Sequence, residues 1–200
     1  MTQQFSKVLT ASLLALGLHG QESSSRYGIA LGGAMPQQLH AATGISAGLN
    51  IHFNQNTSNE GRIRIEGVSF GSKTETTSVT TLESQGSALT LSYDWMPGSK
   101  AIRPIFGVGG MSWSQKLQQN NTGALLGFKS YGGTKSGIAL VPTLGIQYRI
   151  TNYIHLEARY AFPVNITKDK NYYFSYGEDN SIRQMNYLAV GVEIRLPNVR

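Results

Sequence analysis

The chain contains no cysteine, so disulfide bonds cannot stabilise its fold. Charged residues are also scarce, at 14% of the sequence, whereas apolar residues make up 40%, which excludes an intrinsically disordered chain. After the first twenty residues, no apolar run reaches the length of about 18 residues that a transmembrane helix needs. A chain of 200 residues can form one closed domain, whose stability must come from sheet closure, packing or lipid.

Acidic residues are fewer than basic ones, 11 against 17, which gives a net charge of +6. Such an excess could attract anionic lipid headgroups or nucleic acid. The sequence has no basic helix and no interleaved aromatic and basic motif, so we expect no nucleic-acid partner. It also lacks paired cysteines, an HExxH motif, a calcium-binding loop and a phosphate-binding loop, so we expect no metal site and no cofactor.

The beginning of the chain has the three-part pattern of a secretory signal. Residues 1–7 are polar with one positive charge, and residues 8–18 form a mostly apolar run that is too short to span a bilayer. Small residues then offer a cleavage site after Gly20, or alternatively after Gly17. We therefore expect residues 1–20 to be a cleavable signal peptide and the mature protein to be exported.

The rest of the chain repeatedly alternates apolar and polar residues, as half-buried β-strands do. The number of such segments is eight, and an even number brings both ends of a barrel to the same side. Their length of about nine to twelve residues suits tilted strands that cross a membrane. Residues 21–200 are therefore predicted to be all-β, an eight-stranded antiparallel up-and-down transmembrane β-barrel. The predicted strands lie within residues 27–35, 45–53, 62–70, 89–95, 103–113, 140–150, 154–162 and 188–196.

Two of these segments do not keep a simple alternation. In the third, the apolar positions shift from Ile63 and Ile65 to Val68 and Phe70, which predicts a β-bulge near Gly67. In the fifth, residues 103–113, both faces carry apolar side chains. The pattern therefore leaves open which face of the fifth strand points inward.

The connections and the aromatic residues favour a membrane barrel over a soluble one. Short connections at 54–61, 96–101 and 151–153 alternate with connections at 36–43, 74–86, 115–136 and 163–184, three of which are long. Outer-membrane barrels have short periplasmic turns, long external loops and an aromatic girdle at each interface. The predicted girdles are Tyr27, Phe53, Trp95, Tyr148 and Tyr153 at the short turns, and Phe70, Trp113, Tyr160 and Phe162 at the long loops.

The face opposite the apolar one carries the charges of the strands. Alternation alone allows this face to be the lumen of a membrane barrel or the exterior of a soluble one, and the signal, connections and girdles favour the lumen. A lumen tolerates charges that are paired, so we expect a structural salt-bridge network, with a gated ion path as the alternative. Arg149 is expected near His155 or Glu157. The predicted network is Arg62, Arg64, Glu66, Asp94, Arg149, Glu157, Arg159, Glu193 and Arg195.

These features resemble the OmpA-type and OmpX-type small outer-membrane β-barrels, and the segment YLAVGVEIRL at residues 187–196 is similar to the last strand of such barrels. The resemblance implies an outer-membrane location and insertion by the barrel-assembly machinery. The family usually ends in an aromatic residue, whereas this chain ends in residues 197–200, PNVR. No peptidoglycan-binding domain follows the last strand, so we expect no cell-wall tether.

Two kinds of function remain after these exclusions. Basic and aromatic external loops could contact lipopolysaccharide phosphates, so we expect a structural or surface-interaction role in outer-membrane lipid. We also expect the barrel to be a monomer and not an enzyme. A narrow channel is the alternative. A lipid acyl-processing enzyme is less favoured, because His52 and His155 face inward and His40 has no evident serine and acid partners. The candidate surface-binding residues are Lys116, Lys129, Lys135, Lys168, Lys170 and Arg183.

Overall fold

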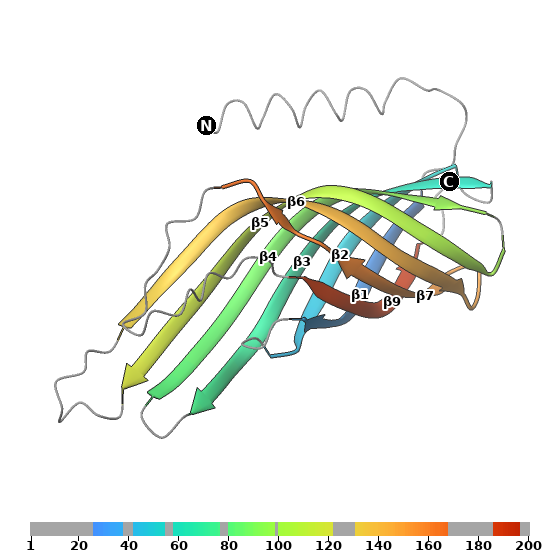
Figure 1. Cartoon of the computed structure of the whole chain (residues 1–200). Coiled ribbons are helices and arrows are strands. Elements are labelled where there is room, and N and C mark those ends of the chain that lie inside the picture. Colours follow the sequence, from blue (N-terminus) through green and yellow to red (C-terminus); the bar gives the residue numbers. More distant parts are fainter. Residues whose placement is uncertain are drawn as a thin grey trace.

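A computed structural model describes residues 26–37, 42–54, 58–76, 80–98, 100–121, 131–167 and 186–196. The predicted signal peptide lies outside the described residues. Within them, no helix is long and apolar enough to cross a membrane. The described chain is all-β (Figure 1).

The strands pair antiparallel, each with its neighbour in the chain, and β1 pairs with β9 to close the sheet. β8 has only two residues and pairs with β6 beyond the end of β7, so the two segments are one barrel strand interrupted at Pro163. Proline cannot donate to the sheet ladder, which explains the interruption. The predicted eight-stranded antiparallel barrel is confirmed. The strands are β1 (Arg26–Pro36), β2 (Gly44–Phe53), β3 (Asn59–Thr76), β4 (Thr80–Pro97), β5 (Ile102–Asn121), β6 (Tyr131–Arg149), β7 (Ile154–Ala161), β8 (Val164–Asn165) and β9 (Tyr187–Arg195).

The register of the strands fixes their tilt. A path of paired residues that starts at Ile138 of β6 and runs round the barrel returns to β6 at Tyr148, ten residues further along. A stagger of this size accompanies a strand tilt of roughly 35–45° to the barrel axis. The path passes through Ser112, Leu89, Gly67, Ala47, Leu31, Val192 and Leu156.

The exterior of the barrel is an apolar belt. Side chains such as Leu144, which is 50% exposed, point outward from every strand of the barrel. At the short-turn end the belt closes with exposed aromatic residues, and the rings of Trp95 and Phe106 lie 5.8 Å apart. The exposed aromatic residues there are Tyr27, Trp95, Phe106, Tyr148 and Tyr153, whereas Phe53, which was predicted among them, is half-buried. A belt of this kind suits lipid, because an aqueous exterior of the same composition would expose one large apolar patch.

The predicted β-bulge near Gly67 is wrong. β3 pairs with β2 without a break from Gly61 to Phe70, and the only irregularity against β4 falls between Phe70 and Lys73. Val68 and Phe70 keep the inward parity of Arg64, and both are buried. The apolar residues change face because the interior itself changes from charged to apolar along the barrel.

The same change of interior settles the facing of β5 and corrects the outer girdle. Phe106 and Val108 point outward, whereas Ile105, Met111 and Trp113 are buried inside. The prediction that Phe70 and Trp113 belong to the outer aromatic girdle is therefore wrong. Of the residues predicted there, Tyr160 and Phe162 lie on the exterior with their rings 4.4 Å apart.

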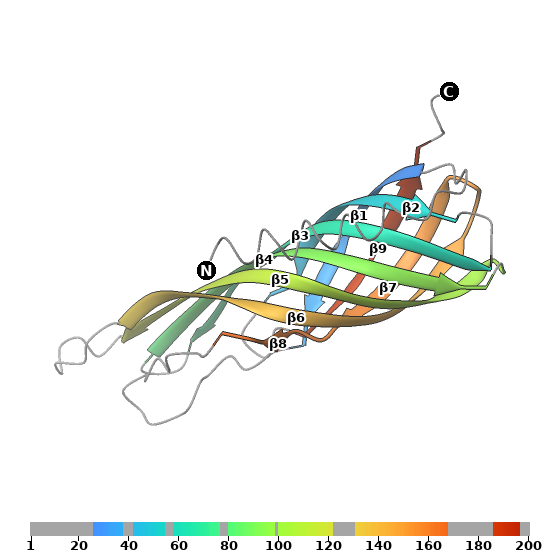
Figure 2. The same ribbon diagram turned by 90° about the horizontal axis from the view of Figure 1, so that it is seen from above.

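Strands β3 to β6 are longer than predicted, with 18 to 20 residues each. Most of the connections predicted at 74–86 and 115–136 is therefore strand. β3, β4, β5 and β6 run past the rest of the barrel at its long-loop end as one sheet (Figure 1, Figure 2). We call this part the projecting sheet, and it consists of residues 71–76, 80–85, 116–121 and 131–137. Its first hairpin is rich in threonine, which looks like a loop by polarity but favours strands.

Candidate functional site

The interior of the barrel brings together the charged residues that alternate along its strands. Arg62 and Arg64 of β3, for example, are 0% and 2% exposed. Five buried carboxylates meet five buried arginines, so the ten groups balance in formal charge. Buried charges are tolerated when they are paired and hydrogen-bonded in this way. The ten residues are Glu60, Glu66, Asp94, Glu157, Glu193, Arg62, Arg64, Arg103, Arg159 and Arg195.

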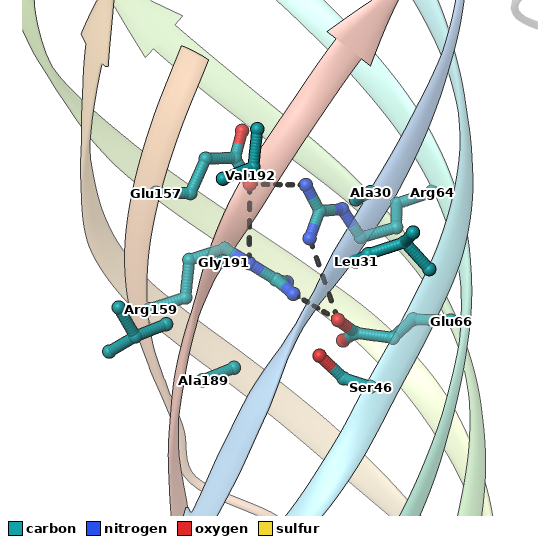
Figure 3. A pocket seen from close by; sticks show the side chains of 11 residues that line it. Ala30, Leu31, Ser46, Arg64, Glu66, Glu157, Arg159, Ala189, Gly191 and Val192 are labelled. Atoms are coloured by element: carbon teal, nitrogen blue, oxygen red, sulfur yellow. Dashed lines mark hydrogen bonds and ion pairs between the residues drawn. The ribbon is translucent and has the colours of Figure 1, made fainter. Parts of the chain in front are cut away.

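The central contacts cross the full width of the lumen. β3 and β7 lie on opposite walls, with three barrel strands between them in either direction. Arg64 donates to Glu157, and Arg159 donates to Glu66. Along each strand, the guanidinium and carboxylate groups are 3.6 Å apart, Arg64 Nη1 from Glu66 Oε1 and Arg159 Nε from Glu157 Oε2. These four residues form a closed ring of alternating charge, the cross-lumen ring (Figure 3).

The ring follows from a simple match between two short sequence motifs. β3 and β7 run in the same direction, because each is an odd-numbered strand of an antiparallel barrel. β3 presents Arg64 and then Glu66 towards the lumen, and β7 presents Glu157 and then Arg159. Each charge therefore faces its opposite across the lumen. An eight-stranded barrel is narrow enough for such side chains to meet in the middle.

Arg62 links a second group of strands closer to the short turns. Its Nε and Nη2 donate to Asp94 Oδ2 over 3.0 and 2.6 Å, and Asp94 is its direct cross-strand neighbour on β4. Its Nη1 donates to Glu157 and, over 3.3 Å, to Glu193. One guanidinium thus connects β3 to β4, β7 and β9. Charge-assisted contacts of this kind are stronger and more directional than neutral hydrogen bonds.

A histidine lies between two carboxylates at the short-turn end of the lumen. His52 Nδ1 is 2.8 Å from Glu60 Oε1, and its Nε2 is 2.6 Å from Glu193 Oε1. Glu60 also accepts from Arg103 Nη1 over 2.6 Å and pairs with Arg195 at 2.8 Å. The predicted inward facing of His52 is confirmed, and both of its ring nitrogens face acids, which leaves neither to activate a serine.

Two members of this network, Glu60 and Arg103, were not predicted from the sequence. One predicted member, Arg149, does not belong to the network. Glu60 lay in a predicted turn, and Arg103 lay in the segment of undecided facing. Arg149 is opposite His155 in the register, as expected, but its side chain is half-exposed at the end of β6. Within the described part of the chain it makes no ion pair. The predicted closeness of Arg149 to His155 is thus confirmed, whereas Glu157 takes its arginine partners, Arg62 and Arg64, from the opposite wall.

Towards the long-loop end, the lumen is filled by apolar side chains. Along β3 the inward residues pass from Arg64 and Glu66 to Val68 and Phe70, and Phe70 meets the ring of Tyr187 edge-on at 5.7 Å. Trp113 Nε1 donates to Asn165 Oδ1 over 2.8 Å, so its polar atom is satisfied. We call this group the apolar layer: Ala34, Val68, Phe70, Ala88, Met111, Trp113, Ala139, Val141, Ala161, Tyr187 and Ala189.

Only some of the predicted surface-binding residues lie among the residues that the structure describes. Lys116 is exposed on β5 in the projecting sheet. Lys135 lies on β6 in the same sheet, without a described side chain. The remaining four, Lys129, Lys168, Lys170 and Arg183, lie outside the described residues.

Solved structures of small outer-membrane barrels share this fold. No protein-family model and no curated protein matches the sequence. The attachment invasion locus protein Ail of Yersinia pestis aligns over 88% of this chain and 100% of its own, with 12% identity and a TM-score of 0.51. The N-terminal β-barrel domain of Pseudomonas aeruginosa OprF gives the same coverages and TM-score with 13% identity. A major outer membrane protein of Thermus thermophilus aligns over 86% of this chain and 99% of its own, with 10% identity and a TM-score of 0.55.

The likeness concerns the fold, and the surface of the molecule agrees with it. The chain has the closed barrel of small outer-membrane proteins, an apolar belt towards the outside and charges towards the inside. Barrels with this inside-out arrangement span outer membranes. This is a transmembrane barrel of the cell outer membrane.

Proposed function

We propose that this outer-membrane barrel is closed to solutes and has a structural and surface-interaction role, which it performs through its projecting sheet. The observation that carries the proposal is the filled lumen. Its charged half is balanced and buried, and its outer half is packed with apolar side chains. A barrel that conducts nothing must act through its surfaces.

Both halves of the lumen oppose the passage of ions. In the charged half, a permeating ion would have to break contacts such as those of Arg62 with Asp94 and Glu157. In the outer half, it would have to enter an apolar constriction around Phe70 and Trp113, where it would lose its hydrating water without gaining polar partners. The narrow-channel alternative would need an open path through both.

We expect the purified barrel to show no steady conductance in planar-bilayer recordings, because ion pairs and the apolar layer close the lumen. The variant Glu157→Lys serves as the probe of selectivity, since Glu157 lies at the centre of the network. Large, steady conductance of the unmodified protein, with ion selectivity that reverses in the variant, would establish a channel and overturn the closed-barrel proposal.

The projecting sheet supports the surface role, because it places polar side chains beyond the membrane. Exposed residues on all four of its strands are polar or charged: Ser72, Thr74, Glu83, Gln85, Lys116, Gln118, Thr134 and Ser136. Ser72 Oγ donates to Glu83 Oε1 over 2.8 Å, which ties its first hairpin together. A polar, hydrogen-bonded sheet of this kind suits a hydrophilic partner or the phosphates of lipopolysaccharide.

The two hairpins of the projecting sheet differ in charge and provide a matched test. Residues 116–135 contain three lysines and no acid, whereas residues 72–85 contain one lysine and two acids. A basic residue near an anionic surface contributes about 1 kcal/mol to binding. Replacing residues 116–135 by a short turn should therefore weaken lipopolysaccharide binding by a factor of roughly 100. Titration of fluorescent lipopolysaccharide onto the barrel in neutral nanodiscs measures the effect.

The same replacement of residues 72–85 is the control, and it should leave lipopolysaccharide binding unweakened. Both shortened proteins should still migrate differently in unboiled and boiled gel samples, because the closed barrel lies below the projecting sheet. Equal binding by the intact protein and the variant without residues 116–135 would show that this hairpin is not the anionic-lipid surface.

A further inference from the structure

A small cavity lies beside the cross-lumen ring, between the ring and the wall formed by β9, β1 and β2 (Figure 3). This wall has small inward residues, among them Ala30, Ser46, Ala189 and Gly191, and the arginines of the ring do not fill the space in front of them. The cavity has a volume of about 10 Å³ for the centre of a water-sized molecule. That is close to the smallest volume that holds one water.

One nitrogen of the ring has an unmet hydrogen bond. Arg64 is 2% exposed and lines the cavity, and among the described residues its Nε has no hydrogen-bond acceptor. The carboxylate oxygen with which this nitrogen forms an ion pair, Asp94 Oδ2, is 3.9 Å away, too far for a hydrogen bond. Buried N–H groups without an acceptor are rare in native proteins, and an internal water commonly satisfies them.

We propose that this cavity binds one structural water molecule. The water accepts a hydrogen bond from Nε of Arg64 and donates to the carboxylate of Glu66 and the hydroxyl of Ser46, which both line the cavity. Three polar partners are what a buried water typically has.

The ligand is a water rather than an ion or an organic molecule for two reasons. The two guanidinium groups of the ring are balanced by its two carboxylates, so the site has no net charge to attract an ion. The volume of about 10 Å³ suits one water-sized molecule. The water thus gives the Nε–H group of Arg64 the acceptor that the protein does not supply.

NMR of the whole barrel in nanodiscs tests the proposal directly. A water-selective NOE experiment should show a cross-peak between the Arg64 Nε–H proton and water. In Ala189→Val, whose added methyl groups occupy the cavity, the cross-peak should disappear and the melting temperature should fall by several degrees. Absence of the cross-peak in the unmodified protein would overturn the proposal.

The direction of the stability change separates a water site from a dry void. Filling a dry apolar void adds packing and stabilises a protein, so a higher melting temperature of Ala189→Val than of the unmodified barrel would also overturn the proposal. Ile194→Leu is the control, since this residue of the same strand faces outward and does not line the cavity. It should keep both the cross-peak and the melting temperature.

Discussion

Replacing Glu157 by alanine is expected to lower the free energy of unfolding by about 3–5 kcal/mol. Glu157 is 6% exposed and accepts hydrogen bonds from Arg62, Arg64 and Gln147, which come from two other strands. Its removal leaves two guanidinium groups inside the barrel with fewer acceptors, away from bulk water. Urea unfolding in lipid vesicles, followed by tryptophan fluorescence, measures the change.

A double-mutant cycle and a surface control make this result specific. Arg64→Ala combined with Glu157→Ala should cost less than the sum of the two single variants, because the pair is removed together. Glu83→Ala removes an acid of the projecting sheet that contacts Ser72, and it should change stability by no more than about 0.5 kcal/mol. An equally small effect of Glu157→Ala would show that the ion-pair network does not stabilise the barrel.

Arginine in the middle of the apolar belt is the second change with a large expected effect. Leu144 is 50% exposed and lies halfway between Leu140 and Tyr148 on β6, so its side chain faces the hydrocarbon region. Leu144→Arg should destabilise the barrel by about 2–4 kcal/mol, because the charge must enter lipid near the midplane. The same urea titration in vesicles reports the difference.

The cost of an arginine should depend on depth. Ile102 is 61% exposed and pairs with Tyr148 at the short-turn end, where the aromatic residues lie. Ile102→Arg should therefore cost roughly 0–1 kcal/mol, since its charge can reach the interface. Similar small effects of both variants would mean that the belt does not face lipid.

The period-two pattern was sufficient for the barrel but not for its interior contacts. Alternation identified the inward side of β3 and β7, because Arg64, Glu66, Glu157 and Arg159 share parity with polar neighbours. It could not identify their partners, which lie on opposite walls rather than on adjacent strands. Which walls face each other depends on the number of strands, and whether side chains meet depends on the lumen width. A search for complementary Arg-x-Glu and Glu-x-Arg motifs four barrel strands apart would have found the ring.

The wrong predictions of a β-bulge in β3 and of long loops after β3 and β5 each have a physical cause. Val68 and Phe70 suggested a bulge because an apolar residue was assumed to face lipid, whereas the outer half of the lumen is itself apolar. The hairpins around residues 77–79 and 122–130 were predicted as loops because their polarity on both faces hides the alternation. Strands that leave the membrane no longer need an apolar side, so their hydrogen-bond ladders continue without that signal.

The uneven filling of the lumen bears on how the chain enters the membrane. Strands that insert from the periplasm with their long-loop ends leading carry Phe70, Trp113 and the other apolar-layer residues through the hydrocarbon first. Within the described part of the lumen, the ion-paired residues lie in the half nearer the short turns. This half follows last, so these residues do not reach the far leaflet. Among the lumen residues, the transfer cost of ionised groups therefore falls on the last part of the movement.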